Sequence, residues 1–484
     1  MTSDQKQHLH PFALIYYVYR GIINWGIWAI ILFSPVRAGL NRVHVNGTAF
    51  LIGFAIFVAG WVLLKFYYFT FQIGDDMVTV NSGIIVKRHT HIPYSRIQTI
   101  QRSQWFFLKP LKLEMLRIET AGHENKRPEV VLPLVSETVR EEIERKRLAK
   151  RSDSTNLTPS EIPASDEAKQ TAPQYEINPH DLNIFAVTSF GVFPLIGVLG
   201  AVYGKIQDYI PQKFIDTVTK ELVQQSLIII SVIVVLIVIL AIIGSYLSIV
   251  QKYYRFTLHA QSGQLKTYQG LFQRKSVTIP VNRIQALRIK QNVLRQWAKL
   301  STVQALAASS AGDEDKGNDM MVLPVIKNDQ VFPHLATFIP WSPTQLVPLT
   351  RLPHANRYYF IRNAMFWSLI PILVCLYFFH LWGLLSLPLL LFSFFLGFYS
   401  AQNTGWQTIA DQILLQNGHW FTRTQFLIPR KNVQSFILVQ SIWMKRTHLA
   451  HLRVNVRHGN HNELVEIRYV PLAAAQNLFD WLES

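Results

Sequence analysis

The sequence predicts an α+β membrane protein in which six transmembrane helices form three hairpins, each followed by a small β-rich domain with a C-terminal helix. Three observations lead to this prediction: long apolar runs occur in pairs, a charged segment with strand-like alternation follows each pair, and these segments share a spaced motif. The chain has 484 residues, 49% hydrophobic and 16% charged, so its apolar residues are concentrated in part of the chain.

The six apolar runs approach or reach the roughly 20 residues that a helix needs to cross a hydrocarbon core. They pair as 21–36 with 48–64, 182–203 with 222–250, and 364–382 with 384–399. Residues 226–250 contain no charge, whereas a core helix of a soluble protein would show a polar face. The first run is the weakest, because Arg20 limits its apolar length.

The three segments that follow the hairpins alternate apolar and polar residues and carry most of the charge, as half-buried strands do. Each contains a glycine, a proline and two glutamines at similar spacing. This repeat signature comprises Gly83, Pro93, Gln98, Gln104, Gly270, Pro280, Gln285, Gln291, Gly418, Pro429, Gln434 and Gln440. The prolines are expected to end strands. The glutamines either bind a partner strand or satisfy local backbone groups, and the second role is preferred.

The repeat divides the chain into hairpins, domains and one linker. The segments are 1–66 (N-terminal segment and hairpin 1), 67–150 (domain 1), 151–178 (linker), 179–250 (hairpin 2), 251–345 (domain 2), 346–400 (hairpin 3) and 401–484 (domain 3). The linker is rich in Ser, Thr, Pro and acidic residues, which predicts disorder.

The hairpins predict one location for all the domains. Because each hairpin crosses twice, the three domains and both termini lie on one side of the membrane. Lysines and arginines crowd that side, so the positive-inside rule predicts a multi-pass cell-membrane protein with cytoplasmic domains and termini. The first twenty residues show no pattern of a cleaved signal peptide.

The unit resembles a known family. In the first two units a glycine is followed ten residues later by the proline of an I-P-x-x-R-I-Q motif. The matching residues are Gly83, Pro93, Arg96 and Gln98, and Gly270, Pro280, Arg283 and Gln285. The unit thereby resembles the bacterial pleckstrin-homology-like (bPH2) domain, and three copies resemble the YdbT-like family of membrane proteins. The resemblance implies a PH-like β-sandwich or barrel with a C-terminal helix, and as partner a smaller PH-like membrane protein or a further copy of the chain.

The third unit departs from this pattern. Its glycine-to-proline spacing is one residue longer, and Asn432 replaces the motif arginine. A divergent role for this copy follows as an expectation.

No catalytic, cofactor or metal site is predicted. The sequence lacks a nucleophile elbow, a phosphate-binding loop and a zinc-protease motif, so we expect no enzyme. The single cysteine, Cys375, excludes an intramolecular disulfide and a zinc site of several thiolates. Histidines 89 and 91 are either exposed on a basic strand or metal ligands, and the first interpretation is preferred. No carboxylate or thiolate accompanies the histidines at 448, 451, 458 and 461 at a recognised spacing, so a metal is not expected there either.

The formal net charge of +17 favours an acidic partner, either nucleic acid or an anionic bilayer. The basic residues around the repeated strands are the candidate lipid or partner contacts, or else the solvated face of a sheet. They are Lys87, Arg88, Arg96, Arg274, Lys275, Arg283, Arg288, Lys290, Arg430 and Lys431. Aromatic residues accompany the apolar runs rather than the basic strands, which disfavours nucleic acid. Asp75 and Asp76 in the first turn argue against specific phosphoinositide recognition.

These observations predict a non-enzymatic membrane scaffold. Its PH-like domains would bind proteins or anionic lipid and serve maintenance or protection of the cell envelope. The alternative is a transporter or export accessory subunit, which six spans would permit. The apolar runs lack the buried charges that mark an ion pathway, so transport ranks second.

Overall fold

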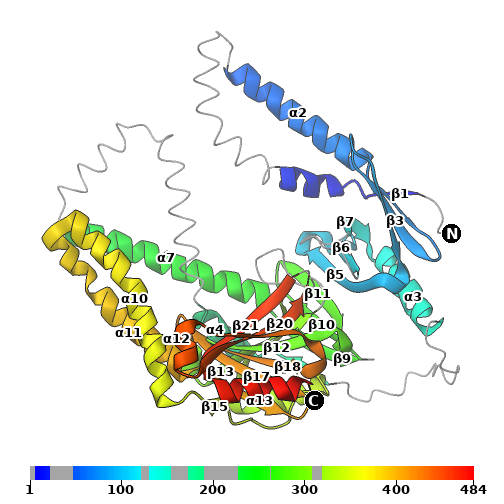
Figure 1. Ribbon diagram of the computed structural model, residues 1–484. Helices are drawn as coiled ribbons and strands as arrows, with labels where there is room; N and C mark the ends of the chain where they lie inside the picture. Colours follow the sequence, from blue (N-terminus) through cyan, green and yellow to red (C-terminus); the bar gives the residue numbers. More distant parts are fainter. Residues whose placement is uncertain are drawn as a thin grey trace.

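The computed structural model describes residues 6–21, 47–120, 130–153, 173–189, 227–261, 263–307, 319–459 and 461–483. These residues form three similar units along the chain (Figure 1). Each unit contributes four strands to one antiparallel sheet and three strands to another, and ends in a helix.

Unit 1 begins with a four-stranded sheet and continues into a three-stranded part. The first four strands are β1 (Gln7–His8), β2 (Thr70–Ile73), β3 (Met77–Ser82) and β4 (Arg88–Pro93). They are followed by β5 (Ile97–Trp105), β6 (Leu113–Thr120), β7 (Val130–Ser136) and the helix α3 (Glu137–Asp153). The apolar helix α2 (Gly47–Tyr67) runs directly into β2.

Unit 2 repeats this order. Its first four strands are β8 (Gln174–Glu176), β9 (Thr257–Gln261), β10 (Gln264–Gln269) and β11 (Gln273–Pro280). The next elements are β12 (Ile284–Gln291), α8 (Val293–Trp297), β13 (Leu300–Ala307), β14 (Met320–Lys327) and α9 (Val331–Phe338). Between β8 and β9 lie α4 (Pro179–Val187) and α7 (Leu227–Tyr253).

Unit 3 has the same plan. It comprises β15 (Thr350–Arg351), α10 (His354–Phe379), the 3-10 helix η6 (His380–Ser386), α11 (Pro388–Gln402), β16 (Gly405–Ile409), β17 (Gln412–His419), β18 (Thr422–Pro429), β19 (Val433–Val439), α12 (Ile442–Arg446), β20 (Leu449–His458), β21 (His461–Pro471) and α13 (Leu472–Glu483). The helices α10 and α11 pack against each other as a hairpin.

The sheets run across the unit boundaries. One seven-stranded sheet has the order β7-β6-β5-β11-β10-β9-β8, and a second has the order β14-β13-β12-β18-β17-β16-β15. Strand β5 of unit 1 therefore pairs with β11 of unit 2, and β12 of unit 2 pairs with β18 of unit 3. We call these contacts the first and the second junction. The predicted domains are consequently joined to one another by their strands.

The repeat signature marks equivalent backbone features. Pro93, Pro280 and Pro429 each end a strand and precede a 3-10 turn with nearly identical φ and ψ. The first glutamine of each unit lies at a β-bulge, where the register shifts by one residue. The second glutamine, at 104, 291 or 440, donates its side-chain amide to the carbonyl of the leucine nine residues later. The repeated spacing thus encodes turns, bulges and side-chain to backbone bonds.

The repeated glycine serves a turn in only two units. Gly83 and Gly270 have φ of +104° and +107°, and a Cβ on either would meet a backbone oxygen at 2.0 Å. In unit 3, β17 ends at His419 and β18 begins at Thr422, so the turn consists of Trp420 and Phe421. These two residues take the positive φ values instead of the glycine. The one-residue insertion in the third unit therefore changes the type of turn.

The prediction of six transmembrane helices in three hairpins is wrong for this structure. Among the described residues, one helical segment, His354–Ser386, is long and apolar enough to cross a membrane. The apolar helical stretches Ile56–Tyr67, Val238–Tyr253 and Pro388–Gln402 are shorter. Nearly all of the predicted run 21–36, and the run 182–203 beyond residue 189, lie outside the described residues.

Part of the error has a physical cause. The run that begins at residue 182 starts within α4, where Leu182 and Phe185 are buried in the apolar core of unit 2. A continuous apolar run is compatible with burial in protein as well as with lipid, so hydropathy alone overcounts membrane spans.

The predicted linker 151–178 is described only at its two ends. Helix α3 extends to Asp153, and β8 occupies Gln174–Glu176, where it pairs with β9. Residues 154–172 lie outside the described residues.

Candidate functional site at the helix-proximal end of the sheets

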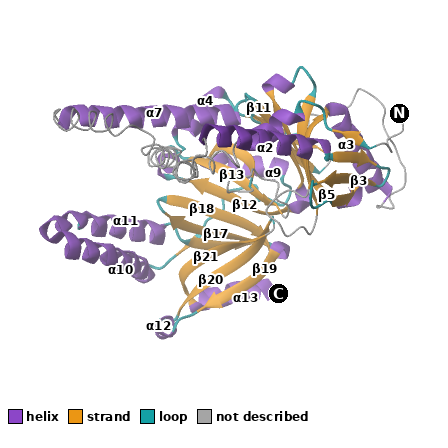
Figure 2. Ribbon diagram, turned by 90° about the horizontal axis from the view of Figure 1, so that it is seen from above, coloured by secondary structure: helices purple, strands orange, loops and turns teal. Residues whose placement is uncertain are grey.

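Among the described residues, the apolar helices α2, α7 and α11 join the sheets at the same end, which we call the helix-proximal end. Helix α2 ends at Tyr67 before β2, α7 ends at Tyr253 before β9, and α11 ends at Gln402 before β16. Strands β2, β9 and β16 pair antiparallel with β3, β10 and β17, and each of the latter leads into a hairpin turn. The first residues of β2, β9 and β16 therefore lie beside these turns. Figure 2 shows α7, α10 and α11 extending from the sheets to the same side.

Large apolar side chains are exposed at this end in every unit. They lie in the hairpin turns and just after the fifth strand of each unit. The exposed residues are Ile85, Val86, Phe106, Phe107, Leu271, Phe272, Trp297, Trp420, Ile442 and Trp443. At the first junction the backbone amide of Phe106 donates to the carbonyl of Phe272 (2.8 Å), and their rings lie 5.7 Å apart. Such a cluster of exposed apolar tips is typical of a binding surface.

A basic pocket of about 430 Å³ opens beside these tips at the first junction, and we call it the junction pocket. Its lining includes five basic side chains and one acidic side chain: Arg102, Lys109, Arg255, Arg274, Lys275 and Glu137. Arg255 follows the end of α7 by two residues and lies over the ring of Tyr254, with 5.6 Å between the guanidinium carbon and the ring centroid. The pocket therefore lies at the end of the apolar helix α7 and is lined by more positive than negative side chains.

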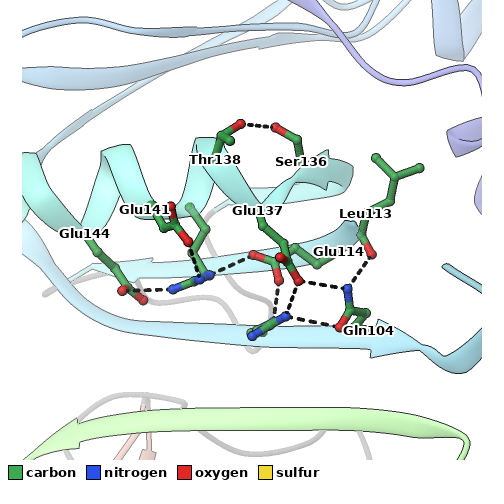
Figure 3. A network of polar contacts seen from close by, with 10 residues as sticks. Gln104, Leu113, Glu114, Ser136, Glu137, Thr138, Glu141 and Glu144 are labelled. Carbon is green, nitrogen blue, oxygen red and sulfur yellow. Dashed lines mark hydrogen bonds and ion pairs between the residues drawn. The ribbon is translucent and has the colours of Figure 1, made fainter. Parts of the chain in front are cut away.

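A polar network fixes the wall of the junction pocket that unit 1 provides (Figure 3). Arg102 forms ion pairs with Glu114 and with Glu137, the latter at 2.7 Å. Glu114 is fully buried and also accepts from Arg140 at 2.9 Å. Burial raises the pKa of Glu114, and the charges of Arg102 and Arg140 oppose that rise. Gln104 bridges Arg102, Glu137 and the Leu113 carbonyl, so Arg102 is held by unit 1 while it faces the pocket.

Comparison with known proteins agrees with this architecture. Residues 27–151, 196–335 and 350–484 each match the family described as "Bacterial PH domain", and together they cover more than half of the chain. The chain belongs to this family. The resemblance predicted from the repeated motif is therefore confirmed.

Similarity to one relative extends over nearly the whole length of both proteins. The chain is 27% identical, over 99% of its own length and 98% of the relative's, to the "UPF0699 transmembrane protein YdbT" of Bacillus subtilis (strain 168). Units 1, 2 and 3 thus correspond to three bacterial PH domains in tandem.

The predicted basic residues of these PH domains fall into three groups. Lys87, Arg88, Arg274 and Lys275 lie at the helix-proximal end, at the start of β4 and of β11. Arg96, Arg283, Arg430 and Lys431 lie in the 3-10 turns that follow the repeated prolines, at the opposite end of those strands. We call this opposite end the proline end. The first group therefore lies beside the apolar tips, and the second lies away from them.

The third group, Arg288 and Lys290, lies in the second half of β12. Arg288 is buried and forms ion pairs with Asp319 (2.6 Å) and with Glu463 of unit 3 (2.5 Å). Burial lowers the pKa of Lys290, and the neighbouring charge of Arg288 adds to this effect. Both residues lie on the strand that pairs with β18 of unit 3 at the second junction.

The histidines form polar contacts within the PH domains. Nδ1 of His89 lies 2.6 Å from the Asn81 side-chain oxygen, and Nδ1 of His91 lies 3.1 Å from the Thr79 hydroxyl. His458, His461 and Glu463 bring possible metal-ligand atoms within 4.8 Å of one another. However, Nε2 of His458 lies 2.9 Å from Asp319, and burial of the imidazole is outweighed by the hydrogen bonds to Asp319 and Glu463, which raise its pKa to about 9. A protonated imidazole has no lone pair for a metal, so this geometry favours an ion-pair network.

Sequence reasoning missed three basic residues of the junction pocket, Arg102, Lys109 and Arg255, as site candidates. A signal for two of them was present: Lys109 follows Phe106 and Phe107 closely, and Arg255 follows Tyr253 and Tyr254. Aromatic residues next to a basic residue are typical of segments at a membrane interface. Arg102 carries no such signal, because its position depends on the network with Glu114 and Glu137.

Proposed function

We propose that this protein is a non-enzymatic membrane scaffold whose bacterial PH domains rest on an anionic lipid surface through the helix-proximal end. The observation that supports this most strongly is the coincidence, at one end of all sheets, of the ends of the apolar helices, the exposed apolar tips and the junction pocket. The matched relative is named a transmembrane protein, and the helical segment His354–Ser386 can cross a membrane by its length and composition.

The energetics favour an anionic surface. Each lysine or arginine near such a surface contributes about 1 kcal/mol to binding. Lys87, Arg88 and Arg274 are exposed beside the apolar tips, while the apolar side chains themselves lose contact with water on entering the headgroup region. The two contributions act at the same end of the molecule and add to each other.

We propose the cytoplasmic leaflet as this surface, with the chain passing the membrane more than once. Lys65 and Lys252 lie in the last turns of α2 and α7, immediately before the sheets, and Arg357 and Arg362 lie in the first turns of α10. Basic residues at the ends of apolar helices favour the cytoplasmic side. A cysteine at Asn282 that reacts with an impermeant maleimide from outside intact cells would overturn this orientation.

The lipid contact is tested with single cysteines in a Cys375→Ala background. Phe272→Cys places a fluorescent bimane label at an apolar tip, and Asn282→Cys places the same label at the proline end of the same strand. Full-length protein is reconstituted in nanodiscs of phosphatidylcholine and phosphatidylglycerol that contain a headgroup-nitroxide lipid. We expect quenching at position 272 and none at 282. Equal quenching at both positions would refute contact through the helix-proximal end.

A further inference from the structure

Among the described residues, two strand edges are open although their equivalents are paired. Strand β4 is one edge of the first sheet, and β19 is one edge of the last. The equivalents of β4 are β11 and β18, which pair with β5 and β12 of the preceding unit. The equivalents of β19 are β5 and β12 themselves. The series of three units therefore begins with an open edge on β4, which is equivalent to the paired edge of β11. It ends with an open edge on β19, which is equivalent to the paired edge of β12.

The two internal junctions have the same register. Gln104 of β5 lies opposite Arg274 of β11, and the equivalent Gln291 of β12 lies opposite Arg423, which occupies the position of Arg274 in unit 3. Continued by one unit, this register places Gln440, which follows β19, opposite Lys87, which precedes β4. It also places Ile437 of β19 opposite Thr90 of β4.

The composition of β19 suits a paired strand better than a free edge. Its sequence, Val433–Val439, contains no charge and no proline. Ile437 is 44% exposed, whereas its equivalents in the paired strands, Gln101 and Arg288, are 8% and 6% exposed. Proteins normally protect exposed edge strands with charge, proline or a covering element, because open apolar edges pair with other chains.

The open edge of β4 resembles the edges that receive β5 and β12. Its residues Arg88 and His89 are polar, as are Arg274 and Lys275 at the start of β11 and Arg423 and Thr424 at the start of β18. In both internal junctions such a polar strand pairs with the fifth strand of another unit. A second copy of this chain carries the matching β19.

We propose that this protein assembles head to tail with further copies of itself, by antiparallel pairing of β19 of one copy with β4 of the next in the register of the internal junctions. In each internal junction the hairpin turns of both units lie at the same end of the sheet, where the apolar helices also join it. The same pairing between copies therefore directs the apolar helices of successive copies to one membrane. Because the two edges differ, the contact is heterologous and produces a ring or a filament. This inference rests on the strand edges and does not depend on the proposed lipid contact.

Disulfide crosslinking in proteoliposomes tests the register. Directly opposed residues of antiparallel strands have Cα atoms about 4.5–5.5 Å apart, which suits a disulfide. In a Cys375→Ala background, the double variant Thr90→Cys, Ile437→Cys is expected to give a ladder of disulfide-linked multimers after mild oxidation. A mixture of the two single variants is expected to give dimers only. The control pair Asn282→Cys, Ile437→Cys should give no ladder.

Two outcomes would overturn the proposal. Absence of any crosslink between positions 90 and 437 would exclude this pairing. Equal crosslinking by the single variant Ile437→Cys would show that β19 pairs with itself, which is a symmetric contact and not a head-to-tail one.

A charge at the open edge provides a second measurement. In nanodiscs large enough for several copies, we expect mass photometry to show oligomers of the wild-type protein. Ile437→Lys places an ammonium group on the β19 edge, and we expect these oligomers to be lost in that variant. Leu464→Lys is the matched control, because Leu464 is 50% exposed on β21, the opposite edge of the same sheet. Equal loss in both variants, or oligomers that survive Ile437→Lys, would contradict the proposal.

Discussion

The two internal junctions have the same backbone register but differ in what lies beside it. At the second junction the apolar cores of two units merge: Leu414 and Leu427 of unit 3 belong to the core of unit 2, and Ala286 and Leu306 of unit 2 belong to that of unit 3. At the first junction no such exchange occurs, because the core of unit 1 contains residues of unit 1 alone among those described.

The polar side-chain contacts also connect the two units more closely at the second junction than at the first. At the second junction Arg423 bonds Gln291, Arg288 pairs with Glu463, and Asn432 donates to the carbonyls of Ile284 and Gln285. At the first junction the residue equivalent to Arg423, Arg274, lines the junction pocket. Strand pairing therefore sets the relative position of two units, while the side chains decide whether the junction is closed or holds a pocket.

The largest difference is expected between Arg288 of the second junction and Arg102 of the first. Arg288→Met should lower the free energy of unfolding by up to about 3–5 kcal/mol, because it removes the buried guanidinium that joins Asp319 to Glu463 across the junction and leaves His458 as the partner of both carboxylates. Arg102→Met should cost less, since Glu114 keeps its ion pair with Arg140. Denaturant unfolding of the detergent-solubilised protein, followed by tryptophan fluorescence, measures both. Equal losses would contradict a more strongly coupled second junction.

The contribution of the second junction to the free energy of unfolding should also depend on pH, through the protonation of His458. Its pKa of about 9 in the folded state exceeds the ordinary value of 6.5, so its stabilising contribution is complete below pH 6.5 and is lost as the pH rises through 9. The shift corresponds to about 3 kcal/mol as an upper value. The measurement is the midpoint of thermal unfolding between pH 6 and pH 10. His458→Gln should flatten this dependence, and an unchanged profile in that variant would contradict the assignment.

The smallest and most selective effect is expected for the equivalent arginines 274 and 423. Arg423→Gln removes a charged hydrogen bond to Gln291 and should cost about 1.5–3 kcal/mol of stability. Arg274→Gln should leave the unfolding midpoint nearly unchanged and weaken the bimane quenching at position 272 in phosphatidylglycerol nanodiscs. The same response from both variants would show that the two junctions do not differ in role.

Much of the repeat geometry could be predicted from the sequence. The spacing of Pro93, Pro280 and Pro429 indicated strand ends, and the structure places a turn after each one. The helix after the last strand was also visible in the sequence, as in Leu472–Glu483. These features depend on local backbone preferences, which a single sequence carries.

The connections between units could not be predicted in this way. Strand alternation indicates which face of a strand is buried but not which strand pairs with its edge, so the pairing of β5 with β11 left no local signal. Arg274 and Arg423 align in the sequence, yet one lines a pocket and the other bonds Gln291 across a junction. The apolar start of α4 likewise indicated a membrane span, although Leu182 and Phe185 belong to a protein core.

The continuity of the sheet across units is tested most directly by an intramolecular disulfide at the first junction. Ser103 of β5 lies opposite Lys275 of β11, whereas Ser276 is one residue out of register and faces the other side of the sheet. In a Cys375→Ala background, Ser103→Cys with Lys275→Cys should form a disulfide within one chain, detected by peptide mass mapping, and Ser103→Cys with Ser276→Cys should not. Failure of the first pair, or equal linkage of both, would contradict a sheet shared between units.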